Sequence, residues 1–255
     1  MSPLDLTPAA TQHRPWPLPD GPWVMSMRWA ALTFLHWPVP AAMLRPLVPA
    51  ALEVDTYDGS AWVGVVPFRM EQTKLRGVPR IPGTHTFAEF NVRTYVRHAP
   101  TGRTGVWFFS LDAASWMAVR AARVSFGLPY FDAQIRVLLP EAGTVYYAGH
   151  RTHRGAPAAA FDARVRPTEE HVAAVPGSLA HWLTERYALF ATRYGSLVTG
   201  DIHHRPWPLR QAHAVIEANT LAHAAGITLP DGEALVHYAE EVDVVAWPPR
   251  VLERG

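Results

Sequence analysis

Proline clusters are the feature that most restricts how this chain can fold. The 255 residues include 24 prolines, and many stand in short runs such as RPWPLPDGP, WPVPAAMLRPLVP and GVPRIPG. Proline lacks a backbone N–H, so it interrupts helices and the interior of sheets. The clusters therefore divide the chain into short segments, which favours a strand-rich fold with many turns over a helical bundle.

The segments between these clusters show mainly strand patterns. We expect a strand over 24–39, hairpins over 52–70 and 130–151, and further strands over 86–96, 106–113, 161–170 and 234–249. Helices are expected over 40–49, 115–126, 177–193 and 210–226. Residues 71–85 read as a long loop that carries Lys74, Arg76 and Arg80. In total, we expect roughly nine to twelve strands and three or four helices.

The domain organisation and composition narrow the classes of function. Residues 1–23 read as an irregular arm, followed by one domain over 24–255. The net charge of +1 gives no electrostatic indication of nucleic-acid binding. Without cysteine, thiolate nucleophiles and Cys-based zinc sites are excluded. The sequence shows neither a secretory signal nor a membrane span, so we expect a cytoplasmic protein with no membrane partner.

The strand over 86–96 has one polar face. Its odd positions carry an acid, an amide, a base and a phenol, namely Glu89, Asn91, Arg93 and Tyr95. Alternate residues of a strand share a face, so these four point the same way. An ordinary solvated face is one interpretation. The other is a pocket, in which a buried Glu89 and Arg93 need each other or a ligand.

Other polar residues have two interpretations each. Asp112 in SLDA lies inward to pair with Arg93, or caps the next helix, which the spacing favours. The pairs His203–His204 and His150–His153 are the only hint of a metal, and no known ligand spacing accompanies them. We therefore expect no metal. No phosphate-binding loop appears, so no cofactor is expected. Lys74 is the only lysine, and a solvated loop position explains it.

Seven segments in order carry a family resemblance, from about Trp29 to Trp247. They are AWVGVVPFRM, NVRTYV, GVWFFSLDA, FGLPYFDAQI, LTERYALF, IHHRPWPL and LVHYAEEVDVVAWP. The chain resembles the YqjF-like family of bacterial proteins, which is similar to the acetoacetate decarboxylase-like superfamily. The resemblance implies a mostly β (α+β) fold, in which a large curved antiparallel sheet closes into a barrel with a few surface helices and a central pocket. It also implies a homo-oligomer.

The resemblance argues against the decarboxylase reaction itself. In acetoacetate decarboxylases, a lysine after a Gly-aromatic-Pro step forms a Schiff base, and a neighbouring lysine lowers its pKa. The matching stretch here is Gly127-Leu128-Pro129-Tyr130-Phe131, which holds no amine. The decarboxylase glutamate is matched by Glu89. Tyr130 either lines the same cavity as a hydrogen-bond donor or weak acid, or is an aromatic core residue.

These observations predict a pocket for a carboxylate or carbonyl compound. Glu89 and Tyr130 would be the catalytic residues, and Arg93, Asn91, Tyr95 and Asp112 would bind the substrate. Arg93 would hold an anionic group, while Glu89 would act as acid or base, or neutralise Arg93 in the empty site. The protein would be a binding protein, or a lyase or isomerase without a Schiff base. The alternative is a structural or interaction protein without catalytic activity, whose N-terminal arm docks on a neighbouring subunit.

Overall fold

The chain folds into one extended network of strands with small helices around it. The computed structural model describes residues 4–79, 85–139 and 143–253. The strands are β1 (Met25–Val39), β2 (Glu53–Val54), β3 (Ala61–Leu75), β4 (Phe87–His98), β5 (Arg103–Ala113), β6 (Tyr130–Leu138), β7 (Val145–Arg151), β8 (Ala160–His171), β9 (Ala188–Arg193), β10 (Ser196–His204), β11 (Arg210–Asn219), β12 (Leu235–Ala246) and β13 (Arg250–Glu253). The α-helices are α1 (Ala41–Leu44), α2 (Trp116–Phe126), α3 (Leu179–Thr184) and α4 (Leu221–Ala224). Short 3₁₀ helices are η1 (Ala9–Thr11), η2 (Arg45–Leu47) and η3 (Ala99–Thr101).

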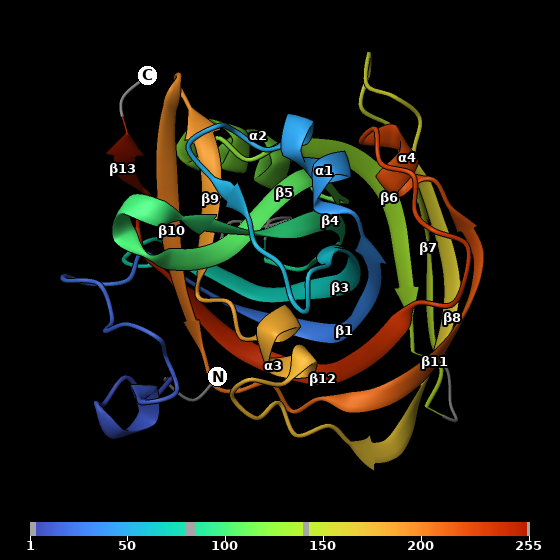
Figure 1. Ribbon diagram of the computed structural model, residues 1–255, viewed down its shortest axis with the longest axis horizontal. Helices are drawn as coiled ribbons and strands as arrows, with labels where there is room; N and C mark the ends of the chain where they lie inside the picture. Colours follow the sequence, from blue (N-terminus) through green and yellow to red (C-terminus); the bar gives the residue numbers. More distant parts are fainter. Residues whose placement is uncertain (1–3, 80–84, 140–142, 254–255) are drawn as a thin grey trace.

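Strand pairing closes the sheet into two rings that share a wall. The shared wall has the order β12-β1-β3-β4-β5. From β5, the pairs β5–β9, β9–β10 and β10–β12 close a smaller ring. Through β6, β7, β8 and β11, the sheet returns to β12 and closes a larger ring. Figure 1 shows the shared strands in the middle, with β9 and β10 on one side and β6, β7, β8 and β11 on the other.

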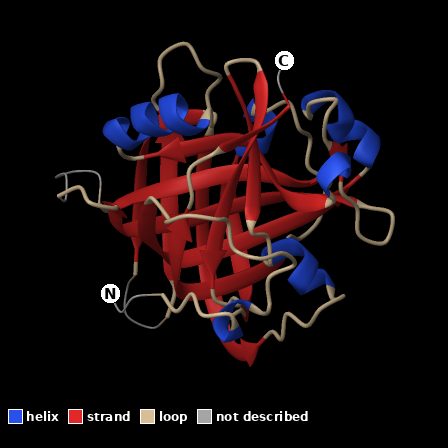
Figure 2. Cartoon of the chain, turned by 90° about the vertical axis from the view of Figure 1, so that its left-hand side faces the viewer, coloured by secondary structure: helices blue, strands red, loops and turns tan. Residues whose placement is uncertain are grey.

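Each ring has its own apolar interior. Phe34, Phe68 and Leu111 belong to a cluster that also includes Ala191 of β9 and Val198 of β10, so it fills the smaller ring. A second cluster joins the opposite face of the shared wall to β7, β8 and β11 and fills the larger ring. Both faces of the shared wall are thus buried. Figure 2 shows the strands crossing in the centre of the molecule and the helices around their outside.

A bulge in β1 decides which residues of that strand enter the smaller ring. Ala31 has a φ of 46°, and the β1–β3 register shifts between Ala30 and Leu35. Before the bulge, Met27 belongs to the cluster of the smaller ring, whereas after it Leu32 and Phe34 do. An extra residue on one strand reverses the alternation of its side chains. Because of this shift, the even-numbered residues at the end of β1, including His36, face the smaller ring.

Both ends of α2 are capped, and the residue that caps its N-terminus differs from the one predicted. Gly127 ends the helix with a φ of 70°, in the left-handed conformation that glycine adopts without strain. The N-terminal cap is Ser115, whose side chain accepts a hydrogen bond from the backbone N–H of Ala118. The prediction that Asp112 caps this helix is therefore wrong, since Asp112 lies inside β5. Ser178 caps α3 in the same way, by accepting from the backbone N–H of His181.

Four predicted elements differ from the structure. The helix expected over 177–193 ends at Thr184 as α3, and Ala188–Arg193 form strand β9 instead. The segment 52–70 is not a simple hairpin, because β2 pairs with β4 rather than with β3, although the turn at Asp58-Gly59 is present. Strand β3 continues to Leu75, so Glu71–Leu75 are not part of a loop, and Arg80 lies outside the described residues. Residues 210–219 form β11 instead of a helix. Their burial alternates residue by residue, which is the strand period.

The N-terminal arm packs on its own chain. Arg14 is buried and its Nη1 donates to the carbonyl oxygen of Ile202 at 2.6 Å. The indole N–H of Trp16 donates to Asp201 at 3.1 Å. Asp201 is buried and also accepts from Arg103 and Arg250. These contacts hold the arm against β10 of its own chain.

Replacing Gly127 by alanine should destabilise the fold strongly. A Cβ at this position would lie 2.6 Å from the carbonyl oxygen of Thr192 in β9, and the positive φ adds backbone strain. We expect a loss of about 3 kcal/mol or more in the free energy of unfolding, measured with urea. Gly155 is the matched control, because its φ is 80° but a Cβ there meets nothing within 4 Å. Gly155→Ala should cost only about 1 kcal/mol, and equal losses in the two variants would contradict the close approach of α2 to β9.

Candidate functional site

The polar face of β4 lies inside the smaller ring. Phe87 and Tyr95, at the two ends of this face, are buried, as are Glu89 and Asn91 between them. Their β3 partners are Phe68 opposite Glu89 and Val66 opposite Asn91, both in the apolar cluster of the smaller ring. The side chains of these four residues therefore point into a protein interior, whereas Arg93 on the same face is partly exposed.

Glu89 is a buried carboxyl group without a cationic partner among the described residues. It is 2% exposed, and the hydroxyl of Tyr130 donates to its Oε2 at 2.8 Å. Burial raises the pKa of Glu89 to about 8, with a small further increase from Asp112, while hydrogen bonds from Tyr130 and Asn91 oppose the rise. Burial and the neighbouring Glu89 likewise raise the pKa of Tyr130 well above its usual value. At neutral pH this pair is thus predominantly a neutral acid beside a neutral phenol.

Tyr130 reaches Glu89 because β6 starts beside the end of β5. Tyr130 pairs with Leu111 in a parallel ladder, and Leu111 pairs with Asn91. Tyr130 is 8% exposed and belongs to the apolar cluster of the smaller ring. The turn Gly127-Leu128-Pro129 that follows α2 delivers it there. The position that the family resemblance matched to the Schiff-base lysine therefore holds a phenol in direct contact with Glu89.

Arg93 does not pair with Glu89, contrary to the expected neutralisation. Its guanidinium carbon lies 5.2 Å from the ring centre of Phe34 and 5.7 Å from that of Tyr95. The Cα atoms of Glu89 and Arg93 are four residue steps apart along β4, which is about 13 Å. Gly64, opposite Arg93 on β3, leaves room for this side chain and for His36, since a Cβ there would lie 3.2 Å from His36 Nε2. The two charged residues therefore occupy different parts of the same face.

A second polar group surrounds Tyr95, and most of it was missed in the sequence. The hydroxyl of Tyr95 and Nε2 of His36 are 2.6 Å apart. The guanidinium carbon of Arg186, which follows α3, lies 5.0 Å from the ring centre of Tyr95. Arg186 also donates to Asp55 at 2.8 Å and to the carbonyl oxygen of Trp182 at 2.6 Å. We call Arg93, Tyr95, His36 and Arg186 the arginine end of the smaller ring, and Glu89, Asn91 and Tyr130 its carboxyl end.

No sequence signal singles out His36 or Arg186. His36 faces this ring because of the Ala31 bulge, and its pKa is held well below the usual range by burial, then by Arg93 and His237. Arg186 lies about 90 residues from β4 in the chain and arrives through the loop between α3 and β9. Only the segment LTERYALF, residues 183–190, marked this stretch, as part of the family resemblance. The tertiary fold brings these residues together.

Asp112 belongs to a different environment. Arg151 of β7 holds it through two hydrogen bonds, Nε to Oδ1 at 2.6 Å and Nη2 to Oδ2 at 2.9 Å. Both residues are buried, and the Arg151 guanidinium lies 4.0 Å from the ring centre of Phe131. Asp112 pairs across the ladder with Phe90, whose side chain faces the larger ring. The expected pairing of Asp112 with Arg93 is therefore wrong, since the two lie on opposite faces of the wall.

The histidines and Lys74 lie apart from this site. His203 and His204 are buried in β10 under the N-terminal arm, where burial lowers their pKa values to about 4 and about 3. His153 pairs with Asp132 at 2.9 Å, and His150 is exposed on β7. Among the residues described here, no group of three or more His, Asp or Glu side chains could hold a metal. Lys74 is exposed near the end of β3.

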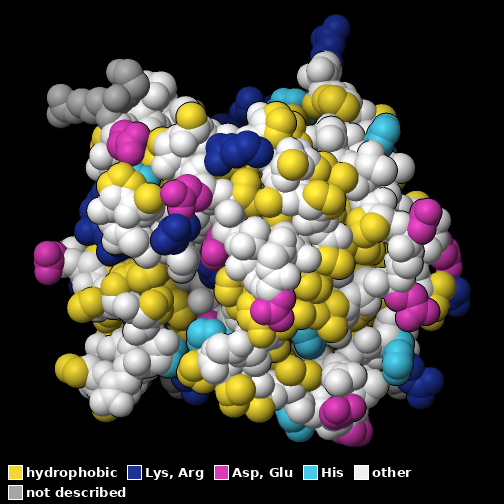
Figure 3. Space-filling view, viewed as in Figure 1, with side chains coloured by type: hydrophobic (Ala, Val, Ile, Leu, Met, Phe, Trp, Pro, Cys, Tyr) yellow, Lys and Arg dark blue, Asp and Glu magenta, His cyan; other side chains and the backbone are white. Residues whose placement is uncertain are grey.

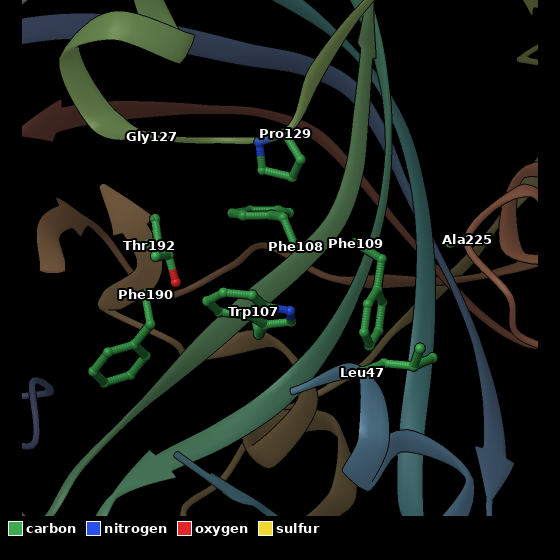
Figure 4. A pocket seen from close by; sticks show the side chains of 10 residues that line it. Leu47, Trp107, Phe108, Phe109, Gly127, Pro129, Phe190, Thr192 and Ala225 are labelled. Atoms are coloured by element: carbon green, nitrogen blue, oxygen red, sulfur yellow. The ribbon is translucent and has the colours of Figure 1, made fainter. Parts of the chain in front are cut away.

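Two hollows on the molecule lie outside these residues. One, of about 370 Å³, occupies the fork where β6 and β9 diverge from β5. Figure 4 shows its aromatic walls, with Trp107, Phe108 and Phe190 on one side and Phe109 and Leu47 on the other. The second, of about 500 Å³, has a charged lining that includes Arg69, Glu71 and Arg210.

Figure 3 shows acidic and basic side chains interspersed on one face, around an apolar middle. In the described part of the chain, no helix is long and apolar enough to cross a bilayer.

Comparisons with known proteins show the family. A model of the DUF2071 family, described as an uncharacterized conserved protein, matches residues 26–243. The chain is also 44% identical over 233 residues to the uncharacterized protein YqjF of Bacillus subtilis, covering 91% of this chain and 94% of YqjF. The chain belongs to the DUF2071 family. The resemblance to YqjF-like proteins is thereby confirmed over nearly the whole chain.

Solved structures show that this DUF2071 protein has an acetoacetate decarboxylase-like fold. Acetoacetate decarboxylase from Legionella pneumophila matches with a TM-score of 0.63 at 14% identity, over 99% of this chain and 98% of that chain. The enduracididine biosynthesis enzyme MppR in complex with pyruvate matches with a TM-score of 0.59 at 16% identity, over 92% and 91%. At such low identity the likeness is one of fold. It confirms the expected mostly β architecture with a large sheet.

Glu89 should make stability fall with rising pH. Its folded pKa of about 8 exceeds the ordinary value of 4.5, so the folded state holds a proton that the unfolded state has lost. Stability is therefore lost as pH rises from about 4.5 and levels off above about 8, by as much as about 1.4 kcal/mol per pH unit between them. Glu89→Gln should remove this slope, so that the variant gains a few kcal/mol relative to the natural protein between pH 5 and pH 9.

Urea unfolding at several pH values measures this slope. Glu169→Gln provides the control, because the side chain of Glu169 is 99% exposed and its removal should leave the pH profile unchanged. An identical profile for Glu89→Gln and the natural protein would show that Glu89 is ionised in the fold, and would contradict the neutral carboxyl.

Proposed function

We propose that the smaller ring of this DUF2071 protein binds a small molecule with a carboxylate and a carbonyl group. The observation that carries the proposal is the contact between Glu89 and Tyr130, a buried neutral acid bonded to a phenol. Burying a carboxyl group without a cation costs stability, and such groups are concentrated at functional sites. Tyr130 would orient the carbonyl, Arg93 would hold the carboxylate, and Asn91 and Tyr95 would line the site between and beside them.

The chemistry that these residues support is acid–base chemistry without a Schiff base. With Glu89 ionised, its carboxylate can take a proton from the carbon next to the carbonyl, and the electron pair of the broken C–H bond moves into an enolate. The Tyr130 hydroxyl then donates a hydrogen bond to the enolate oxygen. Return of the proton from Glu89 to carbon completes an isomerisation or an exchange. Proton transfers of this kind occur in isomerases and as steps of lyase reactions. A ligand-binding protein would use the same site without the proton transfer.

Solved relatives by fold support the choice of ligand class. MppR was captured with pyruvate, and another of its complexes holds a condensation product of pyruvate. Those ligands belong to MppR. They show that a fold of this kind accommodates carboxylates with a carbonyl group, and the buried pair of Glu89 and Tyr130 here is chemically suited to the same class. Cytoplasmic location and a homo-oligomer stay predictions.

A structural protein is the alternative, and one observation favours it. The carboxyl end is enclosed by the apolar cluster of the smaller ring, in which Phe34, Phe68 and Trp207 take part. In that case Glu89 and Tyr130 would only satisfy each other, and no ligand would affect stability.

Removing the Tyr130 hydroxyl should weaken ligand binding. We expect oxo acids to raise the melting temperature of the protein in a concentration-dependent way, and Tyr130→Phe to weaken binding about tenfold, the effect of one lost hydrogen bond of about 1.4 kcal/mol. Tyr146→Phe is the matched control, since Tyr146 is 39% exposed on β7. If screens of oxo acids, hydroxy acids and acyl compounds give no shift, the structural alternative holds.

Proton exchange separates catalysis from binding. An enzyme of this kind should exchange the hydrogens next to the carbonyl of a bound oxo acid with deuterium from D₂O, as followed by NMR. The rate should increase as pH rises through about 8, because Glu89 then ionises, and Glu89→Gln should abolish it. Binding without exchange at any pH would leave a binding protein and refute the catalytic role of Glu89.

A further inference from the structure

The arginine end contains buried polar atoms that nothing else in the fold satisfies. Among the described residues, hydrogen-bond partners are absent for Arg93 Nε, Arg186 Nη2 and His36 Nδ1. Arg186 is 7% exposed and His36 is fully buried. Most buried polar groups in proteins have a partner, so several unsatisfied atoms around one side chain, Tyr95, require an explanation. Asn91 Oδ1, nearer to the carboxyl end, is in the same condition.

These atoms are hydrogen-bond donors, and the charge around them is positive. With the Tyr95 hydroxyl donating to Nε2 of His36, the hydrogen of the neutral imidazole lies on Nδ1, and all three groups then offer N–H. Among the described residues, Asp55 supplies the one carboxylate that pairs with either guanidinium group, and it binds Arg186. Arg93 has no carboxylate partner in the described residues. The arginine end thus carries a positive charge that Asp55 only partly compensates, together with three N–H groups without a hydrogen-bond partner among the described residues.

The distance between the two ends limits the ligand. The Cα atoms of Glu89 and Arg93 are about 13 Å apart along β4, and the charges that shift the pKa of Glu89 do not include Arg93. Tyr130 lies beside Leu111, which pairs with Asn91, two residues closer to Arg93. In pyruvate the carboxylate and the carbonyl are adjacent, so one such molecule does not reach both ends. Between the ends lie apolar groups, chiefly Val66, Phe34 and Leu111. A ligand that contacts both ends has an apolar chain in its middle.

We propose that the ligand is an extended oxo acid whose carboxylate binds Arg93, Arg186 and His36, while its carbonyl, several methylene groups away, binds Tyr130 and Glu89. This inference rests on the proposed function and adds the length of the substrate to it. Three donors hold the carboxylate, and the two guanidinium groups make the contact charge-assisted. The short 2- and 3-oxo acids, which reach only one end at a time, bind more weakly.

A series of methyl-ketone acids tests this length. The series runs from pyruvate and acetoacetate, through 4-oxopentanoate, 5-oxohexanoate and 6-oxoheptanoate, to 7-oxooctanoate, and binding to the purified full-length protein is measured by titration calorimetry. We expect affinity to increase along the series to a maximum at three to five methylene groups, at least about tenfold tighter than for pyruvate. The methyl ester of the best member should lose that gain, since it carries no charge.

Variants assign the carboxylate to the arginine end. Arg93→Met should lower affinity for the best acid about tenfold or more while leaving its methyl ester unaffected, and Arg93→Lys should restore part of the loss. Arg97→Met is the matched control, because Arg97 lies on the same strand, half exposed and paired with Glu53, and should change nothing. Arg186→Lys is a less specific test than these variants, since Arg186 also donates a hydrogen bond to Asp55.

The failure of this inference differs from the failure of the proposed function. If pyruvate or acetoacetate binds best, or if chain length and ester formation have no effect, the two-ended ligand is refuted and the pocket at Glu89 and Tyr130 stands. If no member of the series binds, and Tyr130→Phe gives the same result as the natural protein in the ligand screen, the proposed function is refuted. The present inference is then refuted as well, because it rests on that function. The chain-length series needs no variant, so it decides the question even where Arg93→Met does not fold.

Discussion

Closure of the sheet into two rings through one shared wall is the constraint on which the site depends. Because β12, β1, β3, β4 and β5 belong to both rings, each face of β4 meets a protein interior. Alternation along β4 then divides its side chains, with Phe90 and Val92 in the larger ring and Glu89 and Asn91 in the smaller one. In an open sheet, the polar face of β4 would be exposed to solvent. Here it lines the interior of the smaller ring.

Burial inside this ring determines the chemistry of each polar group. Glu89 has no cation beside it, so it keeps its proton and bonds with Tyr130. Arg93 cannot lose its charge in this way, and it lies against the aromatic rings of Phe34 and Tyr95. Asp112 and Arg151, by contrast, neutralise each other in a close ion pair on the other side of the wall. The acid and the base on one face of the wall therefore neutralise each other, whereas those on the other face lie apart.

The local elements of this site could be predicted from the sequence, and its assembly could not. Alternation placed Glu89, Asn91, Arg93 and Tyr95 on one face, and Gly127 and Pro129 marked the turn that delivers Tyr130. The β1 bulge at Ala31 has no sequence signature, since a non-glycine residue with positive φ is held by its surroundings. His36 and Arg186 are brought in by that bulge and by a distant loop. Residues 210–219 show the same limit, because alternating alanines fit a helix or a strand until the neighbouring strands decide.

The ionisation of Glu89 in the folded protein is the most direct test of this account. Protein labelled with ¹³C at the glutamate side-chain carboxyl groups, compared with Glu89→Gln to assign the signal, allows the carboxyl resonance to be followed with pH by NMR. The account predicts a titration midpoint near pH 8, the value that burial gives this group. A midpoint near 4.5, the ordinary value for glutamate, would show a solvated or ion-paired carboxylate and would contradict the neutral acid on which the proposed site depends.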